Sequence, residues 1–367
     1  DSLFVKMADE AIKLSDSYLN SKEIIQAALD TGAEAIHPGY GFLSENAKFC
    51  RAVLKAGLLW VGPSARVIAS MGDKLKAKDL AEKSGVPTLP MTTNPKKVKD
   101  IGYPLLIKAA AGGGGKGMRI VKSAKDLNES IKAAQREAKS GFGDDRIFIE
   151  KYIAVSRHIE IQILGDTHGN LVHLGERECS IQRRHQKIIE ESPSPRVDPE
   201  MRHAMGEAAL KLAKKLKYES AGTVEFLVDE SGAFYFLEMN TRLQVEHPVT
   251  EMITGQDLVE WQLRVACGEP LPLAQDDISI NGHAFESRLY AEDPARDFMP
   301  QTGRVHHFSY PQQSQYMRVD TGIEAGDSVS VHYDPMVAKL ASWGEDRTSA
   351  ALNMAELLRC TYMSGFP

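Results

Sequence analysis

Two glutamates in a predicted β-hairpin are the residues with the clearest chemical meaning. The segment TVEFLVDESGAFYFLEMN at 223–240 has strand-like runs on both sides of a turn at 230–233. With the turn centred there, Glu225 lies opposite Glu238, and directly opposed Cβ atoms are about 4.5–5.5 Å apart. Two like charges at that distance repel each other unless a cation lies between them. Carboxylate and amide oxygens suit Mg²⁺, so the hairpin predicts a metal site made by Glu225, Glu238 and Asn240.

The polar residues continue at alternate positions beyond the hairpin. If the chain stays extended, one face carries Glu238, Asn240, Arg242, Gln244 and Glu246. Such alternation is also typical of the solvated face of an antiparallel sheet. The opposed glutamates, and the lack of lysine at the five face positions, favour the metal site.

A run of four glycines in AAAGGGGKGMRIV predicts an anion-binding loop. It is not the phosphate loop of ATPases, which needs Ser or Thr after the lysine and then a helix, because strand-like residues follow here. The missing helix also excludes a dinucleotide-binding turn. Strand, glycines and strand describe a hairpin flap in which the N–H groups of Gly113, Gly114 and Gly115 converge on phosphate oxygens. The alternative is a surface hairpin without a ligand.

Basic residues near this loop and farther along the chain extend the anion site. Lys108 lies in the apolar strand YPLLIKAAA, where a lysine is rare unless paired, and a triphosphate would pair it. The stretch CSIQRRHQKIIEE places Arg183, Arg184, His185 and Lys187 within five residues. A charge run is usually a solvated face, but the flanking isoleucines indicate that this one crosses structured core. It could therefore hold a second anion.

The elements that must position these residues fall into three regions. The chain has 367 residues, more than a single hydrophobic core usually serves. Helix-like and strand-like segments alternate over 1–85, which predicts a parallel α/β domain. The glycine flap, the hairpin and a helix starting at Asp198-Pro199 lie within 86–280. Short strands and a last helix fill 281–367.

Composition excludes several classes of protein. The chain is 43% hydrophobic and 26% charged with a net charge of −6, so neither nucleic acid nor an anionic membrane surface is an expected partner. The four cysteines form no CxxC pair, which argues against a zinc site or a disulfide framework and suggests a reducing compartment. No apolar run approaches the roughly 20 residues that span a bilayer.

The motifs together closely resemble the biotin carboxylase component of biotin-dependent carboxylases, an ATP-grasp family. The resemblance covers about residues 5–345 and rests on the stretches HPGYGFLSEN, MGDK, IKAAAGGGGKGMRIV, EKYI, RHIEIQ, ERECSIQRRHQKIIEE, AGTVEFL and EMNTRLQVEHPVTEMITG. Within the family, DLVEWQLRVA, GHAFESRLYAEDP, FMP and VSVHYDPMVAKL are most similar to methylcrotonoyl-CoA carboxylase α subunits. Propionyl- and acetyl-CoA carboxylase subunits share most of these positions.

The resemblance implies a multidomain fold that combines α/β and α+β parts. A parallel α/β (pre-ATP-grasp) domain at 1–85 is expected to be incomplete, because the family's N-terminal strand is missing. An ATP-grasp region at 86–280 would contain the glycine-rich flap subdomain at about 103–155. A truncated mixed β domain would follow at 281–367.

The resemblance also implies a reaction in which ATP, bicarbonate and biotin give ADP, phosphate and carboxybiotin, with Mg²⁺ or Mn²⁺. The implied nucleotide-binding residues are Lys74, Lys108, Gly113, Gly114, Gly115, Glu150, Lys151, Ile153, His158, Gln182 and His185. The metal would be bound by Glu225, Glu238 and Asn240. The implied bicarbonate ligands are Lys187, Arg242, Gln244 and the Val245 backbone, with Glu246 as the base and Arg318 steadying the biotin enolate.

The partners and location also follow from the resemblance. No biotinyl motif of the Ala-Met-Lys-Met type occurs, so a biotin carboxyl carrier domain is expected outside this sequence or on another chain. A carboxyltransferase (β) subunit and a homo-oligomer or α/β hetero-oligomer are expected, in the mitochondrial matrix of a eukaryote or otherwise in the cytoplasm. Two alternatives stay open: an ATP-grasp ligase that joins a carboxylate to an amine, and a non-catalytic nucleotide-sensing or assembly subunit.

Overall fold

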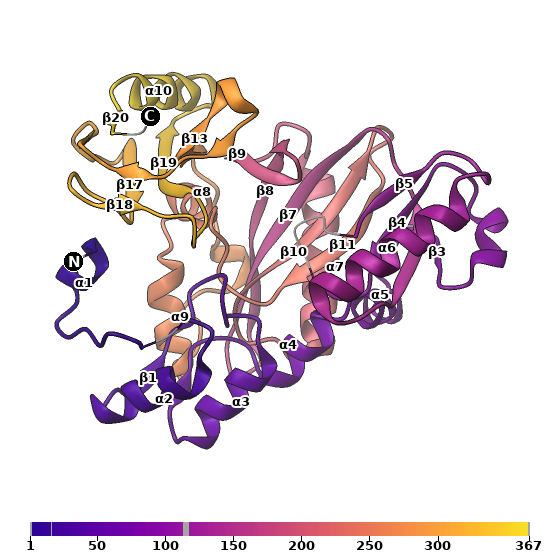
Figure 1. The fold of residues 1–367 in the computed structure, drawn as a ribbon, viewed down its shortest axis with the longest axis horizontal. Helices are drawn as coiled ribbons and strands as arrows, with labels where there is room; N and C mark the ends of the chain where they lie inside the picture. Colours follow the sequence, from indigo (N-terminus) through magenta and orange to yellow (C-terminus); the bar gives the residue numbers. More distant parts are fainter. Residues whose placement is uncertain (1, 16, 113–116, 366–367) are drawn as a thin grey trace.

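The computed structural model describes residues 2–15, 17–112 and 117–365. The N-terminal helices, the flap subdomain and the C-terminal strands surround a set of long central strands (Figure 1). The predicted glycines Gly113, Gly114 and Gly115 lie outside the described residues. Among those described, no helix is both long and apolar enough to cross a membrane.

The N-terminal part is a small parallel α/β unit. Its elements are α1 (Leu3–Met7), α2 (Ser21–Asp30), β1 (Ala35–Ile36), α3 (Ala47–Lys55), β2 (Leu59–Trp60) and α4 (Ala65–Met71). Strands β1 and β2 pair in parallel as a two-stranded sheet, and Phe49, Val53 and Trp60 form part of the core beside them. This confirms the predicted parallel sheet.

The flap subdomain is a four-stranded antiparallel sheet with one long helix. It comprises β3 (Met91–Thr92), η1 (Pro95–Asp100), β4 (Leu105–Ala109), β5 (Arg119–Val121), α6 (Leu127–Phe142) and β6 (Ile147–Lys151), with strand order β3-β6-β4-β5. Strands β4 and β5 flank the glycine run and pair with each other. Helix α5 (Lys74–Lys83) precedes the subdomain, and the Lys74 N–H donates to the Ala110 carbonyl at 2.9 Å.

Most of the remaining strands belong to one eight-stranded sheet in the order β11-β10-β7-β8-β9-β12-β19-β17. Its first five members are β7 (Ser156–Gly165), β8 (Leu171–Arg183), β9 (Gln186–Ser192), β10 (Ser220–Asp229) and β11 (Phe234–Asn240). The other three are β12 (His283–Tyr290), β17 (Met317–Thr321) and β19 (Met336–Gly344). The predicted ATP-grasp and C-terminal regions therefore share one sheet, joined where β9 pairs with β12.

Helices and short strands complete this part of the molecule. They are α7 (Pro199–Leu216), α8 (His247–Thr254), α9 (Leu258–Ala266), η2 (Gln275–Asp277), β13 (Glu292–Asp293), η3 (Pro294–Arg296), β14 (Met299–Pro300), β15 (Gly303–Arg304), β16 (His307–Ser309), β18 (Ser328–Val329), α10 (Arg347–Arg359) and β20 (Tyr362–Ser364). Helix α7 begins where the sequence predicts, with the Asp198 carboxylate accepting from the Met201 N–H at 2.7 Å.

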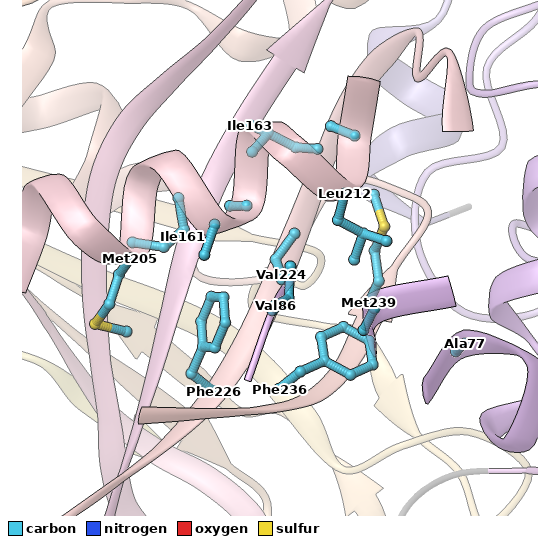
Figure 2. Close-up of a cluster of buried hydrophobic side chains, with 14 of the residues drawn as sticks. Ala77, Val86, Ile161, Ile163, Met205, Leu212, Val224, Phe226, Phe236 and Met239 are labelled. Carbon is cyan, nitrogen blue, oxygen red and sulfur yellow. The ribbon is translucent and has the colours of Figure 1, made fainter. Parts of the chain in front are cut away.

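One face of the central sheet is apolar and packs against α7 (Figure 2). Ile161 and Ile163 of β7, with Val224 and Phe226 of β10, lie in this core. Because side chains alternate across a strand, the intervening polar residues of β7 and β10 point to the opposite face. These are His158, Glu160, Gln162, Thr223 and Glu225, and the site is built on that face.

The predicted hairpin is confirmed, with one irregularity. Glu225 pairs with Glu238 as expected, but a β-bulge follows and Phe226 pairs with Phe236 rather than with Leu237. The predicted uniform register is therefore wrong on the turn side of Glu225. The extra residue, Leu237, lets Phe236 reach the core while Leu237 itself lines a cavity. Bulges re-aim side chains in this way next to functional sites.

Candidate active site

A cavity of about 310 Å³ lies between the flap subdomain and strands β10 and β11. Nine predicted site residues line it, which are Lys74, Lys108, Glu150, Lys151, Ile153, His158, Gln182, His185 and Glu238. They come from five separate stretches of the chain. The fold therefore brings together the predicted nucleotide-binding residues that the structure describes.

Two lysines and one glutamate form a buried triad, of which Lys108 and Glu150 line this cavity. Lys108 of β4 donates to Glu150 Oε1 of β6 at 2.8 Å, and Lys78 of α5 contacts the other oxygen. Burial alone would raise the pKa of Glu150, but the two ammonium groups outweigh it and lower that pKa. One carboxylate between two lysines leaves a positive charge, which favours an anion in the cavity. Lys78 escaped sequence reasoning, although its motif KLKAKD is conspicuously basic.

Most of the remaining cavity lining is apolar and suits the flat ring of a nucleobase. Its members include Leu89, Leu106, Met118, Tyr152, Leu227 and Leu237. Sequence reasoning missed them because they are indistinguishable from core residues of a strand. The Lys151 ammonium is held by the carbonyls of Gly102 and Tyr103, both at 3.1 Å. Its side chain is therefore anchored in the wall.

The facing glutamates are held by cations from different elements. Glu238 accepts from Lys74 Nζ at 2.8 Å. Glu225 accepts from His158 Nε2 at 2.5 Å, Asn240 Nδ2 at 2.7 Å, Lys187 Nζ at 3.2 Å and Gln244 Nε2 at 3.3 Å. Burial raises the pKa of Glu238 and the Glu225 charge raises it further, but Lys74 and Lys108 together outweigh both effects and lower it. The two carboxylates thus feel each other's charge, as the sequence predicts.

These residues fit a hard divalent cation by donor chemistry. Two neighbouring carboxylates and the Asn240 amide provide only oxygen ligands, the set that Mg²⁺ prefers. Asn240 turns its Oδ1 toward Arg242 Nη2 at 3.1 Å and its Nδ2 toward Glu225. Within the described residues, His158, Glu160 and Glu225 form another group of possible ligand atoms, all within 4.8 Å of one another. A second such group is Glu160, Cys179 and Glu246, and Glu238 belongs to neither.

A second subsite lies beside the first, around Glu246. This residue precedes helix α8 and is 1% exposed. It accepts from Lys187 Nζ at 2.6 Å and from Arg288 Nη2 at 3.0 Å. Burial raises the pKa of Glu246, but Lys187 and Arg288 outweigh burial and lower it. Arg288 was missed, because the strand HAFESRLY also contains His, Glu and Ser and its arginine does not stand out in the sequence.

Arg242 is fixed by partners on both sides. Its Nε donates to Glu45 Oε2 at 2.9 Å, and one Nη donates to Gln244 Oε1 at 2.9 Å. The predicted extended path beyond Asn240 is wrong, because β11 ends there and a turn leads into α8. The predicted polar residues still converge through these side-chain contacts. Glu45, from the N-terminal part, was missed.

A fully buried arginine holds polar residues that lie next to both subsites. Arg177 donates to Glu160 Oε1 and Gln162 Oε1, both at 2.6 Å, and also contacts Thr223 and Thr250. The other oxygen of Glu160 accepts from Lys187 Nζ at 2.6 Å. Lys187 therefore contacts Glu160, Glu225 and Glu246 and joins the two subsites.

Three predicted basic residues lie apart from this centre. Arg318 of β17 pairs with Glu251 Oε2 at 2.6 Å and with Asp320, and no described contact joins it to Lys187, Arg242 or Glu246. Arg183 and Arg184 contact Glu292 and Asp297 of the C-terminal part. The predicted basic run thus divides, and only its His185 and Lys187 face the site.

A larger cavity of about 550 Å³ opens on the C-terminal side of Glu246. Tyr40, His247, Asp320 and Lys339 are among its lining residues. Lys339 Nζ donates to the Val245 carbonyl at 2.8 Å and lies 3.3 Å from Asp320 Oδ2. The predicted Val245 backbone is therefore tied to this cavity. Asp320 also pairs with Arg318. Lys339 and Asp320 therefore connect Arg318 to the site.

Family models cover almost the whole chain. They are "Biotin carboxylase, N-terminal domain" at 1–68, "Carbamoyl-phosphate synthase L chain, ATP binding domain" at 73–274 and "Biotin carboxylase C-terminal domain" at 286–367. The chain is 53% identical over 380 residues to the mitochondrial methylcrotonoyl-CoA carboxylase subunit alpha of Oryza sativa, covering 100% of this chain and 52% of that protein. It is 51% identical to the propionyl-CoA carboxylase alpha chain of Caenorhabditis elegans, covering 98% and 51%. It therefore spans about half the length of these curated relatives.

Solved structures match over a larger share of their length. The biotin carboxylase domain of Hydrogenobacter thermophilus 2-oxoglutarate carboxylase, a dimer in complex with MgADP, ADP and bicarbonate, has a TM-score of 0.96 and 45% identity. The match covers 99% of this chain and 83% of that one. Biotin carboxylase of Campylobacter jejuni, in a β-γ-ATP complex, gives 0.95 and 45%, with 100% and 84% covered. With three family models in order along the chain and this agreement in fold, the chain belongs to the biotin carboxylase family.

Proposed function

We propose that this chain is the biotin carboxylase part of a biotin-dependent acyl-CoA carboxylase, most similar to methylcrotonoyl-CoA carboxylase of leucine catabolism. It would use ATP and bicarbonate to carboxylate biotin on a carrier domain. The observation that carries the proposal is the position of Lys187, whose ammonium contacts both Glu225 and Glu246. The acidic residues for a magnesium nucleotide and a base for bicarbonate thus meet in one site.

The chain's own residues would divide the work as follows. Arg242 and Lys187 hold the bicarbonate anion, and Glu246 accepts its proton. The freed oxygen attacks the γ-phosphorus of ATP, the bond to the β-phosphate oxygen breaks, and carboxyphosphate and ADP result. Lys74 and Lys108, which line the cavity, offset charge on the phosphates. Glu225, Glu238 and Asn240 would hold Mg²⁺, which would supply further neutralisation of that charge.

The acceptor and the partners lie outside this sequence. Arg318 and the cavity lined by Tyr40 and Lys339 would face the biotin ring. A separate carboxyltransferase (β) subunit would choose methylcrotonoyl-CoA over propionyl-CoA or acetyl-CoA, within a homo-oligomeric or α/β hetero-oligomeric enzyme. The protein would act in the mitochondrial matrix of a eukaryote, as the names of its curated relatives suggest, or in a bacterial cytoplasm.

The direct test is ADP release by the purified full-length subunit. We expect ATP cleavage to require bicarbonate and to be stimulated by biotin. ATP cleavage that depends on neither bicarbonate nor biotin, or that responds to an amine acceptor instead, would contradict the proposal.

The base is tested separately by Glu246→Gln. We expect bicarbonate-dependent turnover to fall by about 10²–10⁴-fold, because a positioned general base contributes that much. ATP binding, measured by calorimetry, should be retained. An equal loss of turnover and ATP binding would show that Glu246 supports the fold of the site and is not the base.

A further inference from the structure

Behind Glu246 lies a second pair of facing carboxyl groups that the reaction scheme above does not use. Glu190 of β9 and Glu286 of β12 are direct cross-strand neighbours, and both are 0% exposed. Glu190 Oε2 and both carboxyl oxygens of Glu286 are buried without a hydrogen-bond partner in the described part of the chain. An ionised carboxylate in that state is very costly, and two of them side by side cost more.

Among the described residues, Glu190 forms an ion pair with Arg288, which also contacts the proposed base. Arg288 Nε donates to Glu190 Oε1 at 2.7 Å, while Arg288 Nη2 donates to Glu246 Oε2 at 3.0 Å. Arg288 is thus shared between two carboxylates. If Glu190 carried no charge, Arg288 would interact mainly with Glu246 and hold its proton affinity lower still.

We propose that Glu190 and Glu286 share one proton and act as a positioning pair for Glu246. The acid form of Glu286 donates a hydrogen bond to Glu190 Oε2. The negative charge that remains on the pair competes with Glu246 for Arg288. This keeps Glu246 basic enough to take a proton from bicarbonate. The inference rests on the proposed function, in which Glu246 is the base.

The surroundings of the pair agree with a single shared proton. The titratable and charged groups that act on it from the packed elements are Arg288 and Tyr290 of β12, Lys339 of β19, Lys187 of β9, Cys179 of β8 and Glu246 before α8. Burial raises the pKa of Glu190 to about 7 even though Arg288 opposes it. Burial also raises the pKa of Glu286 well above its ordinary value, against the effect of Lys339.

The test measures bicarbonate-dependent ADP release by the full-length subunit across pH for Glu190→Gln, Glu190→Asp and Glu286→Gln. For Glu190→Gln we expect kcat to fall at least about tenfold, with the acid limb of kcat/KM for bicarbonate moving about one unit lower. KM for ATP should not change. Glu190→Asp retains the charge and should recover most of the rate. Glu286→Gln can donate to Glu190 as the acid does, so its loss should be about threefold or less on the scale of one neutral hydrogen bond.

An infrared measurement tests the shared proton without activity. Wild type at neutral pH should show a carboxylic-acid C=O band that Glu286→Gln lacks. Glu191→Gln, on the other face of β9, is the matched control and should keep both the band and the rate. If Glu190→Gln does not fold, the infrared comparison and the Glu190→Asp profile still decide.

Several outcomes would overturn the inference. These are an unshifted acid limb in Glu190→Gln, equal losses for Glu190→Gln and Glu190→Asp, or the same infrared band in Glu286→Gln as in wild type. If wild type shows the band but no bicarbonate-dependent turnover, the proposed function fails while the shared proton stands.

Discussion

Glu225 is the most heavily contacted carboxylate of the site, with donors from β7, β9, β11 and the turn after β11. A carboxylate offers about four lone-pair positions, so a metal ion that binds Glu225 must replace at least one of these donors. In the described part of the chain Glu238 forms an ion pair with one lysine, so it is the easier ligand to recruit. Without a nucleotide, the two facing glutamates therefore differ in the number of donors that they bind.

This inequality makes Glu238 the better residue for testing the metal site. Saturating nucleotide at about 100 times its Kd should stabilise the protein by about 2.7 kcal/mol. In Glu238→Gln we expect the part of this gain that depends on Mg²⁺ to disappear, while nucleotide with EDTA stabilises as in wild type. Thermal unfolding measures both parts. Glu230→Gln, at an exposed position in the same hairpin, should behave as wild type, and a full magnesium effect in Glu238→Gln would contradict the site.

Arg177 supplies a prediction about stability. Its guanidinium is fully buried and holds Glu160. Arg177→Met should lower the free energy of unfolding by about 3–5 kcal/mol, because it leaves a buried carboxylate short of a partner. Urea titration measures the change. The control, Lys83→Met, breaks an exposed helix pair with Asp79 and should cost under about 0.5 kcal/mol; equal costs would mean that the buried network adds nothing.

Sequence reasoning found the paired glutamates of one hairpin from the residues themselves and found site residues of other stretches through the family resemblance, but it missed three that arrive from distant segments. Glu225 and Glu238 follow from local pairing, whereas Lys78, Glu45 and Arg288 reach the site through contacts between distant segments. Glu160 and Arg177 belong to buried strands, where the role of a charged side chain cannot be inferred until its partner is known.

At the scale of elements, ends with local chemistry were predictable. Asp198 and Pro199 start α7 as expected, since both act within a few residues. The bulge at Leu237 was not predictable, because the core under α7 demands it. The end of β11 was missed because the polar alternation continues past the strand, even though Pro248 marks the start of α8.

The cap of α7 gives an element-scale prediction. Asp198→Ala should lower the free energy of unfolding by about 1 kcal/mol, because the N–H of Met201 loses its acceptor. Asp198→Asn should cost only a few tenths, since asparagine caps nearly as well. Urea titration of both variants measures the difference. Equal destabilisation by alanine and asparagine would show that the cap hydrogen bond is not the cause.

At the scale of the whole molecule, three predicted regions prove to be less independent than their sequences suggest. Strand β12 extends the sheet of the ATP-grasp region, and Glu45 from the N-terminal part holds Arg242. Pairings across such sequence distances leave no local periodicity. The predicted boundaries near 85 and 280 remain predictions about where the chain could be divided.

Glu191 tests how firmly these parts are joined. On β9 it binds His283 of β12 and Arg347 of α10. Burial raises the pKa of Glu191, but these two partners outweigh burial and lower it from 4.5. A carboxyl group whose pKa is lowered in the folded state stabilises the protein at pH values above its ordinary pKa. This stabilisation is lost as the pH falls through the pKa of the folded state.

Glu191→Gln should therefore be less stable than wild type at pH 7, by about 1–2 kcal/mol. The difference should shrink as pH falls below 4.5. Urea unfolding of both proteins between neutral and acidic pH measures it. A difference that is constant across this range would rule out the Glu191 charge as its source.

The seam between β9 and β12 also limits how the chain can change. A slip of one residue along a strand shifts it by about 3.3 Å and turns every side chain to the opposite face. Lys187, Glu190 and Glu191 all lie on β9, so deleting one residue there would exchange the active-site face for the outer face. Loops around this sheet can lengthen, whereas the loss or gain of a single residue in the strand changes which side chains face the active site.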